Sequence, residues 1–319
     1  MRELYGFYID HKMTQPSAMA LHSAKIKPLA RELAENGVLL VCTCARIEIY
    51  GEKFALTNIV ETIFSGFCYK HVEGAVAIIK RIAEIAASAH SQILGESNIS
   101  NQLEDAIQSV NQKLAIFYIA RFAIDIGRAA RDRMQFTASF NYNEIVREIV
   151  ADRFPNDENL DSLYIIGSGM LGRELIGSDV RERFKGTVMV TRNPKNLRKR
   201  LRLSTDAGLT FMRPADIGLT FEPRSIVVIA TSDVDGEYEA NIRNAVLRLK
   251  PRVIVDLSSV PVLTEAGVGE LDYVSIYGEE FLRFIVENNK HLAPKLPLLF
   301  ADIEETIQTA HMYLCSEVS

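Results

Sequence analysis

Short apolar runs and longer stretches of helical spacing divide this chain into distinct segments. In the first third, apolar runs at 4–9 and 38–41 predict strands, and the pattern over 28–36 predicts a helix between them. Pro28 is compatible with that helix because proline is tolerated in a helix's first turn. The first segment is therefore expected to mix strands with helices.

The middle of the chain, 101–154, is predicted to be helical. It contains Gly127 but no proline, and its apolar residues recur at helical spacing, as at Phe117, Ala120 and Ile124. Turn-forming residues follow at 155–159, which predicts a domain boundary there.

Beyond this boundary, β-rich runs alternate with helical stretches. The runs lie at 162–166, 187–191, 225–231, 253–257 and 273–277. Continuously apolar strands separated by helices indicate a parallel sheet covered on both faces. From Glu279 to Ser319 the pattern is helical again, and Pro294 and Pro297 are expected to interrupt the helix.

A glycine-rich loop joins the first of these later strands to a helical stretch. The loop consists of Gly167, Ser168, Gly169, Met170, Leu171 and Gly172. In a dinucleotide-binding loop, the first glycine permits the tight turn, the second lets the backbone approach a pyrophosphate, and the third lets helix and strand pack closely. The helix N-terminus would supply amide donors for the phosphates. The alternative is a structural glycine turn without a ligand.

The end of the following strand indicates which dinucleotide is bound. A carboxylate there would hydrogen-bond the ribose hydroxyls of NAD, whereas this chain has Arg192 with Lys195 close by. A guanidinium suits a 2′-phosphate, so the sequence favours NADPH.

These patterns predict a multidomain α/β protein. Residues 1–105 would form an α+β N-terminal catalytic domain that carries the candidate nucleophile Cys44, and 106–154 would form long connecting helices. Residues 155–280 would form a Rossmann-type NADP-binding domain, and 281–319 a short helical tail. A composition of 48% hydrophobic and 24% charged residues is typical of globular proteins. No apolar run approaches the ~18 residues that span a bilayer, and the N-terminus lacks signal-peptide features, so we expect a soluble, cytoplasmic protein.

The cysteines and charges bear on three further features: disulfides, metal sites and nucleic-acid binding. Four cysteines at irregular spacing do not form a disulfide framework, and no second Cys/His pair accompanies Cys42 and Cys44, so no metal site is expected. The net charge of −5 gives no overall reason to expect nucleic-acid binding. Basic clusters at 121–133 and 192–202 are either phosphate contacts or solvated helix faces.

Cys44 is the candidate nucleophile. It follows the apolar run 38–41 and precedes a turn, a place where a side chain can face a cleft. Arg46, two residues on, could lower the pKa of the thiol and bind a substrate carboxylate. The alternative is that Cys44 is a buried small hydrophobe.

Several segments together resemble the glutamyl-tRNA reductase family. Residues 42–50 are similar to the family's Ser-Thr-Cys-Asn-Arg-x-Glu-Ile-Tyr, and residues 90–102 to its Asp-Ser-x-x-x-Gly-Glu-x-x-Ile-x-x-Gln. The family's Ser-His-Lys resembles Asp10-His11-Lys12. The Gly-Arg-Ala-Ala-Arg-Asp-Arg of 127–133, the glycine loop and Val255-Asp256-Leu257 before Pro261 fall in family order. The similarity covers about residues 4–290.

The resemblance implies a function and a set of residue roles. Cys44 would attack the ester of glutamyl-tRNA, and NADPH would reduce the resulting thioester to glutamate-1-semialdehyde in tetrapyrrole (porphyrin) biosynthesis. The implied substrate-binding residues are Thr43, Ala45, Arg46, Ser91, Glu96, Ser97, Asn98 and Gln102. The implied partners are glutamyl-tRNA, a glutamate-1-semialdehyde aminomutase and a second copy of the chain, although the tail is short for the family's dimerisation region.

Two departures from the family pattern keep alternatives open. Ala45 stands where the family has asparagine, and Arg81 or Ile78 stands where it has a catalytic histidine. His90 or His71 could supply a base instead. The chain could therefore be a catalytically weak paralogue that binds glutamyl-tRNA or tetrapyrrole enzymes as a regulator, or an NADP-dependent reductase of another small acyl substrate.

Overall fold

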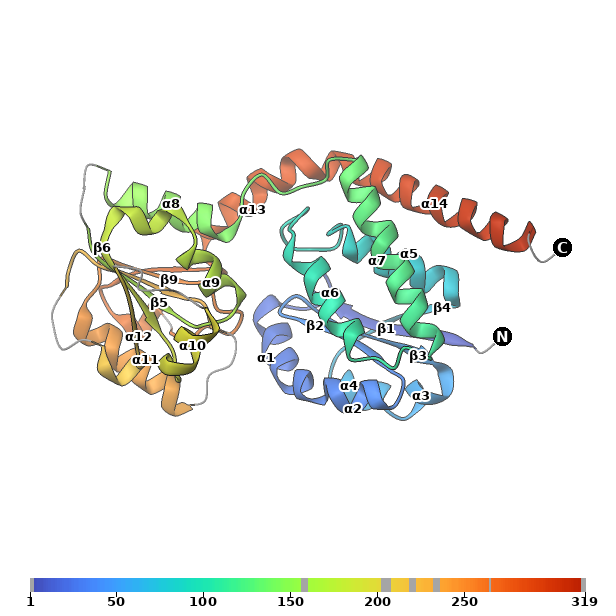
Figure 1. The fold of residues 1–319 in the computed structure, drawn as a ribbon, viewed down its shortest axis with the longest axis horizontal. Coiled ribbons are helices and arrows are strands. Elements are labelled where there is room, and N and C mark those ends of the chain that lie inside the picture. Colours follow the sequence, from blue (N-terminus) through green and yellow to red (C-terminus); the bar gives the residue numbers. More distant parts are fainter. Residues whose placement is uncertain are drawn as a thin grey trace. The chain divides into compact units, whose positions relative to one another are not determined.

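The computed structural model describes residues 3–155, 160–201, 208–217, 222–231, 236–263 and 265–316 (Figure 1). The chain forms two compact units. The first contains Met1–Ser139 and Ile285–Ser319, and the second contains Phe140–Phe284. The chain thus enters the second unit after Ser139 and leaves it after Phe284.

The first unit is built on a four-stranded antiparallel sheet in the order β2-β3-β1-β4. The strands are β1 (Leu4–Asp10), β2 (Leu39–Thr43), β3 (Arg46–Glu52) and β4 (Lys70–Glu73). The strands expected at 4–9 and 38–41 are confirmed as β1 and β2. Strands β3 and β4 were not predicted, and β3 proves to be the centre of the site described below.

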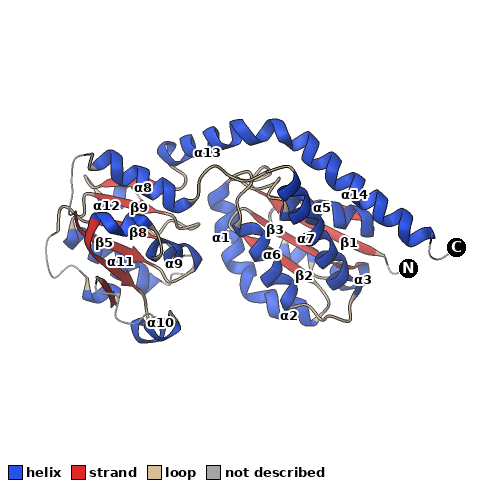
Figure 2. Cartoon of the chain, turned by 45° about the horizontal axis from the view of Figure 1, so that its top comes forward, coloured by secondary structure: helices blue, strands red, loops and turns tan. Residues whose placement is uncertain are grey.

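Helices cover both faces of this sheet (Figure 2). One side carries α1 (Pro16–Ile26), α2 (Ala30–Glu35), α3 (Lys53–Thr57) and α4 (Val60–Ile63), and the other α5 (Ala75–Ala86), α6 (Asn98–Gln108), α7 (Ala115–Arg133) and α14 (Leu296–Ser316). Successive strand residues point to opposite faces. Accordingly, Ile47 and Ile49 pack among the first group and Tyr50 among the second.

The second unit is a six-stranded parallel sheet in the order β10-β9-β8-β5-β6-β7. Its strands are β5 (Leu160–Ile166), β6 (Phe184–Val190), β7 (Leu209–Met212), β8 (Ile226–Ile229), β9 (Val253–Asp256) and β10 (Asp272–Ser275). Its helices are α8 (Tyr142–Arg153), α9 (Met170–Ile176), α10 (Pro194–Arg200), α11 (Gly236–Leu249), α12 (Glu265–Val268) and the first part of α13 (Glu279–Leu292). The predicted parallel sheet is confirmed, with β7 as an additional edge strand. The strand order reverses beside β5, as in Rossmann-type folds.

The helices expected at 106–154 are divided between the two units. Helix α7 packs on α5 so closely that a Cβ on Gly127 would lie 2.2 Å from the Ala83 carbonyl oxygen, whereas α8 belongs to the second unit. Residues 156–159 of the expected boundary lie outside the described residues. The structure thus places the change of unit at Ser139, because the apolar face of α7 is buried in the first unit.

The helical tail contains the interruption that its prolines predict. A short 3-10 turn at Ala293–Lys295 holds Pro294, and Pro297 falls in the first turn of α14. Leu299, Ile303 and Ile307 bury one side of α14 in the first unit's core. Within the described part of the chain, no helix is both long and apolar enough to cross a membrane.

Candidate active site

Cys44 and Ala45 form the tight turn between β2 and β3, and neighbouring segments hold this turn in place. The Ala45 amide donates to Thr43 Oγ1 at 3.1 Å, and the His11 amide donates to the Ala45 carbonyl oxygen at 2.9 Å. Ser23 Oγ donates to the Thr43 carbonyl oxygen at 2.5 Å. Cys44 itself is exposed. The predicted nucleophile is therefore presented at the tip of a well-fixed hairpin.

The Cys44 thiol is protonated at neutral pH in this state. Although the residue is exposed, desolvation by the surrounding protein is the main cause that raises the pKa of the thiol to about 11. The Glu96 carboxylate raises it further, and the Arg46 guanidinium opposes the rise. Arg46 lowers the pKa of the Cys44 thiol, as expected from the sequence, but desolvation raises this pKa by more.

Arg46 begins β3 and points into the protein. It is 1% exposed, and its Nη2 donates to the His90 carbonyl oxygen at 2.5 Å. Its Nη1 lies 3.5 Å from Glu48 Oε1. Its Nε is buried without a hydrogen-bond partner among the described residues. Arg46 is thus largely held by the protein, with one buried N–H left to donate.

Behind the hairpin lies a buried network of charged side chains. Arg81 of α5 lies 2.8 Å from Glu48 Oε1 and 3.2 Å from Asp10 Oδ2, and Tyr50 donates to Glu48. The Arg81 guanidinium also lies 4.0 Å from the centre of the Tyr8 ring. The sequence analysis missed these roles, although polar residues at every second position of β3 were a signal.

The network is held in its charged form by mutual pairing. Burial would raise the pKa of Glu48, but the guanidinium groups of Arg81 and Arg46 and hydrogen bonds from Arg81 and Tyr50 hold it below its ordinary value. Burial likewise opposes the charge of Arg81, yet Glu48 keeps the pKa of Arg81 above its ordinary range. Breaking either partner would therefore leave an uncompensated buried charge.

The structure locates the residues considered for the family's histidine. Ile78 is buried in the apolar core, and Arg81 has the ion pairs just described. His90 Nε2 lies 2.7 Å from Glu84 Oε2, and its ring stacks on Phe300 of α14. His71 is exposed on β4, opposite Phe7.

His11 is a further imidazole that the sequence analysis did not consider as a base. Its backbone is bonded to the Cys44–Ala45 turn, and its Nδ1 is buried without a hydrogen-bond partner among the described residues. Burial, with the charge of Arg46, lowers the pKa of His11 to about 4. The ring is therefore neutral at neutral pH.

The loop before α6 brings a second set of predicted residues toward the hairpin. Ser91 is buried and Glu96 is half-buried, and burial raises the pKa of Glu96 against the opposing effects of Ser91, Arg46 and Arg131. The bond from Arg46 Nη2 to the carbonyl oxygen of His90, which directly precedes Ser91, joins this loop to the hairpin. Ser97 precedes α6, Asn98 begins it, and Gln102 is exposed on it.

Three buried nitrogen atoms around this cluster lack a hydrogen-bond partner in the described residues. They are His11 Nδ1, Arg46 Nε and Arg131 Nε. Buried polar groups in proteins are nearly always hydrogen-bonded, so such atoms need a ligand or water. Two of the three are guanidinium donors, and they fit a small ligand that carries a carboxylate.

The glycine loop of the second unit has the shape that dinucleotide binding requires. Gly167 has φ +117°, and a Cβ there would lie 2.3 Å from the Ala230 carbonyl oxygen. A Cβ on Gly172 would lie 2.1 Å from the Gly167 carbonyl oxygen, so neither position can carry a side chain. At Gly169 the nearest atom to a Cβ is 4.0 Å away. The middle glycine therefore leaves open space for a phosphate to approach the backbone.

The remaining predicted cofactor residues lie around this loop. Met170 and Leu171 begin α9, and Thr191 Oγ1 donates to Ser168 Oγ at 3.4 Å. The Arg192 guanidinium lies 4.8 Å from the centre of the Tyr238 ring of α11. Arg192 follows β6, the neighbour of β5, and so stands at the carboxyl edge where a Rossmann fold binds ribose.

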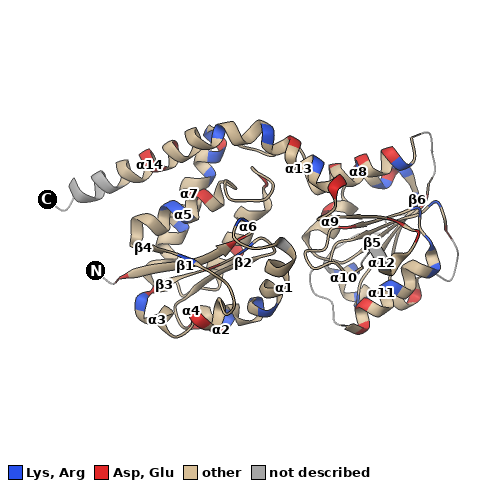
Figure 3. Ribbon diagram, turned by 180° about the vertical axis from the view of Figure 1, so that it is seen from behind, with Lys and Arg blue, Asp and Glu red and all other residues tan. Residues whose placement is uncertain are grey.

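Three arginines of the 121–133 cluster are paired with carboxylates rather than left free to bind phosphate. On α7, Arg121 and Arg128 both pair with Glu104, and Arg133 pairs with Asp302. Figure 3 shows basic and acidic residues interspersed over both units. In the other cluster, Arg202 lies outside the described residues. The α7 arginines thus stabilise contacts among α6, α7 and α14.

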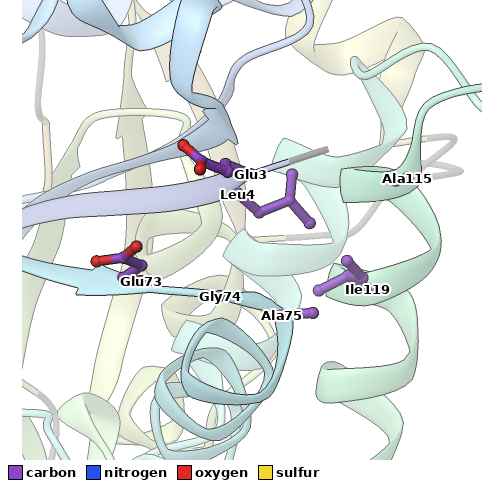
Figure 4. A pocket seen from close by; sticks show the side chains of 7 residues that line it. All are labelled: Glu3, Leu4, Glu73, Gly74, Ala75, Ala115 and Ile119. Atoms are coloured by element: carbon purple, nitrogen blue, oxygen red, sulfur yellow. The ribbon is translucent and has the colours of Figure 1, made fainter. Parts of the chain in front are cut away.

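One hollow of the first unit lies away from this cluster. It has a volume of about 430 Å³ and is lined by Glu3, Leu4, Glu73, Gly74, Ala75, Ala115 and Ile119 (Figure 4). It lies at the start of β1, whereas the Cys44 hairpin is beside the other end, where Asp10 pairs with Arg46. It is therefore not part of the candidate site.

Known proteins resemble both parts of the chain. Residues 9–132 match the family described as glutamyl-tRNAGlu reductase, N-terminal domain. The chain is 56% identical over 310 residues to Protein nfe2 of Rhizobium meliloti, covering 97% of this chain and 100% of that protein. It is 22% identical over 289 residues to a glutamyl-tRNA reductase of Shewanella denitrificans, covering 85% of this chain and 67% of that one. A solved glutamyl-tRNA reductase from Methanopyrus kandleri aligns with a TM-score of 0.49 at 17% identity, covering 98% of this chain and 81% of that one.

Proposed function

The chain belongs to the glutamyl-tRNA reductase family as a divergent member, and from this we propose that it reduces glutamyl-tRNA to glutamate-1-semialdehyde with NADPH. The observation that carries the proposal is the cluster around the hairpin. The exposed Cys44 thiol lies near Arg46, and Arg131 and Ser91 lie next to Glu96 on the adjoining loop; the Nε–H groups of both arginines are buried without a hydrogen-bond partner among the described residues. Such a cluster suits a glutamyl group held next to a nucleophile.

In the proposed reaction, the Cys44 sulfur attacks the carbonyl carbon of the glutamyl ester. A carbon–sulfur bond forms, the ester carbon–oxygen bond breaks, and the released tRNA hydroxyl takes up a proton. Arg46 and Arg131 hold the glutamyl carboxylate through their unpartnered Nε–H groups, and Ser91 donates its hydroxyl hydrogen. Thr43, Ala45, Ser97, Asn98 and Gln102 complete the proposed contacts to the glutamyl group.

The raised thiol pKa means that the attack needs a proton acceptor, and we assign this role to His11. Its ring is neutral at neutral pH, and its backbone is bonded to the reacting turn. The Arg46 charge is one cause of the low His11 pKa. A substrate carboxylate bound to Arg46 would offset that charge and raise the basicity of His11 when the substrate is present.

The glycine loop fits a bound dinucleotide, because Gly169 leaves space where the backbone must approach a pyrophosphate. When bound, NADPH would supply the hydride that reduces the acyl group of Cys44. Gly167 and Gly172 hold the loop's shape, and Ser168, Met170 and Leu171 line it. Arg192 would contact the 2′-phosphate. The aldehyde product would pass to an aminomutase. Two chains would pair through α14.

The experiment combines purified protein with glutamyl-tRNA and NADPH and measures semialdehyde and NADPH oxidation. We expect product with charged tRNA and none with free glutamate. Cys44→Ser should abolish it, whereas Cys42→Ser should not, because the half-buried Cys42 thiol only donates to the Ser23 carbonyl oxygen. Full activity of Cys44→Ser would refute the mechanism, and turnover without charged tRNA would favour a reductase of another acyl substrate.

A second function, tRNA binding without turnover, has one specific observation in its favour. Arg81 stands at a candidate position for the family's histidine and is held by Glu48 and Asp10, so it cannot act as a base. Tight binding of glutamyl-tRNA with no thioester on Cys44 would support that regulatory role.

Cofactor choice is tested separately from catalysis. Arg192→Ala should weaken NADPH binding by about tenfold or more, because a charge-assisted contact contributes roughly 1.5–3 kcal/mol. It should leave NADH binding nearly unchanged. Equal weakening of both would refute the assignment of Arg192 to the 2′-phosphate.

A further inference from the structure

The loop that carries Ser91 and Glu96 is fastened by two adjacent asparagines from a distant part of the sequence. The Leu94 amide donates to Asn289 Oδ1 at 3.0 Å, and Asn289 Nδ2 donates to the Gln92 carbonyl oxygen at 2.9 Å. Asn288 Nδ2 donates to the Leu94 carbonyl oxygen at 3.0 Å. Three backbone groups of one short loop are therefore held by α13 side chains.

Asn288 also holds the segment that follows α7. Asn288 Oδ1 accepts from the Ser139 amide at 2.9 Å and from Ser139 Oγ at 3.2 Å. The Ala138 amide donates to the Gly95 carbonyl oxygen at 3.0 Å, and a Cβ on Gly95 would lie 2.7 Å from the Ala138 nitrogen. The loop, the segment 137–139 and α13 thus meet in one closely packed junction within the first unit.

This junction adjoins the candidate site and the two places where the chain changes unit. Ser91 and Glu96 flank the fastened residues 92–95, and the Glu96 carbonyl oxygen accepts from Ser88 Oγ and Arg131. Asn288 is 1% exposed, so its amide group has no access to solvent that could replace these bonds. Ser139 is the last residue before the chain enters the second unit, and Ile285 the first after it returns.

We propose that Asn288 and Asn289 are positioning residues that hold Ser91 and Glu96 against the Cys44 hairpin. The inference rests on the proposed function, since it concerns the loop that would hold the glutamyl group. Neither asparagine touches the reacting atoms. Each acts through the backbone of residues 92–95, and together they fix where the loop lies relative to Cys44 and Arg46.

The test uses Asn289→Asp and Asn288→Asp in the full chain. Aspartate keeps the acceptor oxygen but replaces the donor NH₂ by an oxygen that faces a carbonyl, so the loop should open more readily. We expect hydrogen exchange at the Leu94 amide to rise about tenfold or more. Asn36→Asp is the matched control, because Asn36, which follows the end of α2, likewise donates from its Nδ2 to a backbone carbonyl oxygen, that of Glu32.

A second readout distinguishes positioning from general stability. The groups that act on the Cys44 thiol are Glu96 from this loop, Arg46 from β3 and Cys42 from β2. If the loop moves away, the effect of Glu96 is lost, and the pH profile of Cys44 alkylation should shift to lower pH. Asn36→Asp should leave the profile unchanged.

Two results would overturn the proposal. One is an unchanged Leu94 exchange rate and alkylation profile in folded Asn289→Asp. The other is an equal shift in Asn36→Asp. Because Asn288 is buried, Asn289→Asp keeps the test valid if Asn288→Asp does not fold. Both readouts work without turnover, so absence of reductase activity would count against the proposed function but not against the positioning role.

Discussion

The two sheets of this protein carry their candidate chemistry in different ways. In the first unit, Arg46, Glu48 and Tyr50 form an inward-facing row on β3, and α5 supplies Arg81 to pair with it. In the second unit, the central strands β5, β8 and β9 are mostly apolar and buried, with Asp256 at the end of β9, and the candidate ligand-binding residues follow the strand ends. One site depends on paired buried charges, and the other depends on backbone shape.

This difference predicts which substitutions destabilise each unit. Buried ion pairs are costly to break, because removing one partner strands the other in a medium of low dielectric. A glycine loop contains no such charges, but it fails if a Cβ meets backbone that cannot move. Substitutions of the buried charges should therefore lower the stability of the first unit, whereas substitutions in the glycine loop should change the loop's shape and NADPH binding in the second.

The largest effect is expected for Glu48→Gln. It leaves Arg46 and Arg81 without their shared carboxylate and should destabilise the first unit by about 3–5 kcal/mol. Region-resolved hydrogen exchange should show lost protection in β1, β3 and α5, with the second unit unchanged. Glu35→Gln is the control, because its pair with Arg31 is exposed and should contribute at most about 1 kcal/mol. Equal, small effects of both changes would contradict the importance of the buried network.

A smaller effect is expected for alanine substitutions in the glycine loop. Gly172→Ala places a Cβ against backbone and should destabilise the second unit by about 1–3 kcal/mol. Gly169→Ala meets nothing nearer than 4.0 Å, so it should leave stability unchanged yet weaken NADPH binding. Calorimetric titration measures NADPH binding by each variant, and hydrogen exchange measures the stability of the second unit. Undiminished NADPH binding by Gly169→Ala would show that the loop does not hold the pyrophosphate.

A third effect, which needs no substitution, is expected on acidification. Burial, with the charge of Arg46, lowers the pKa of His11 to about 4 from an ordinary value of 6.5, so the unfolded chain takes up this proton first. The first unit should therefore lose stability as the pH falls from 6.5 towards 4. Desolvation raises the pKa of the buried Asp256 in the second unit, so protonation of Asp256 adds stability there as the pH falls.

This acid response is measured by exchange protection in each unit, corrected for intrinsic rates. His11→Asn should reduce the acid sensitivity of the first unit only. A loss of stability that is the same in both units would contradict the contrast.

The same difference explains what could be predicted from the sequence. Strands β5, β6, β8, β9 and β10 were predicted because strands buried on both faces are continuously apolar. Strand β3 was missed because its buried row is polar. Cys44 and Arg46 were singled out by their place after an apolar strand, and Ser91 and Glu96 by a family resemblance. A bond from Arg46 to the His90 carbonyl oxygen joins the two segments in the structure.

Other contacts of the site join residues far apart in the sequence. The alternating polar residues of β3 signalled a special role for Glu48 but not its partner Arg81, and nothing signalled the contacts of Asn288 and Asn289 with the Leu94 loop. The pKa of His11 is lowered by burial and by the charge of Arg46, and only the folded chain brings these about. The effect expected for Arg46 on the Cys44 thiol was opposed by desolvation, a quantity that residue spacing does not contain.

The most direct test of the central claim is acylation of Cys44 by labelled glutamyl-tRNA with NADPH withheld, followed by mass spectrometry of the digested protein. We expect a glutamyl thioester on Cys44 that accumulates without NADPH, disappears when NADPH is added and is absent from Cys44→Ser. No label on Cys44, or equal labelling of the Cys44→Ser variant, would contradict it.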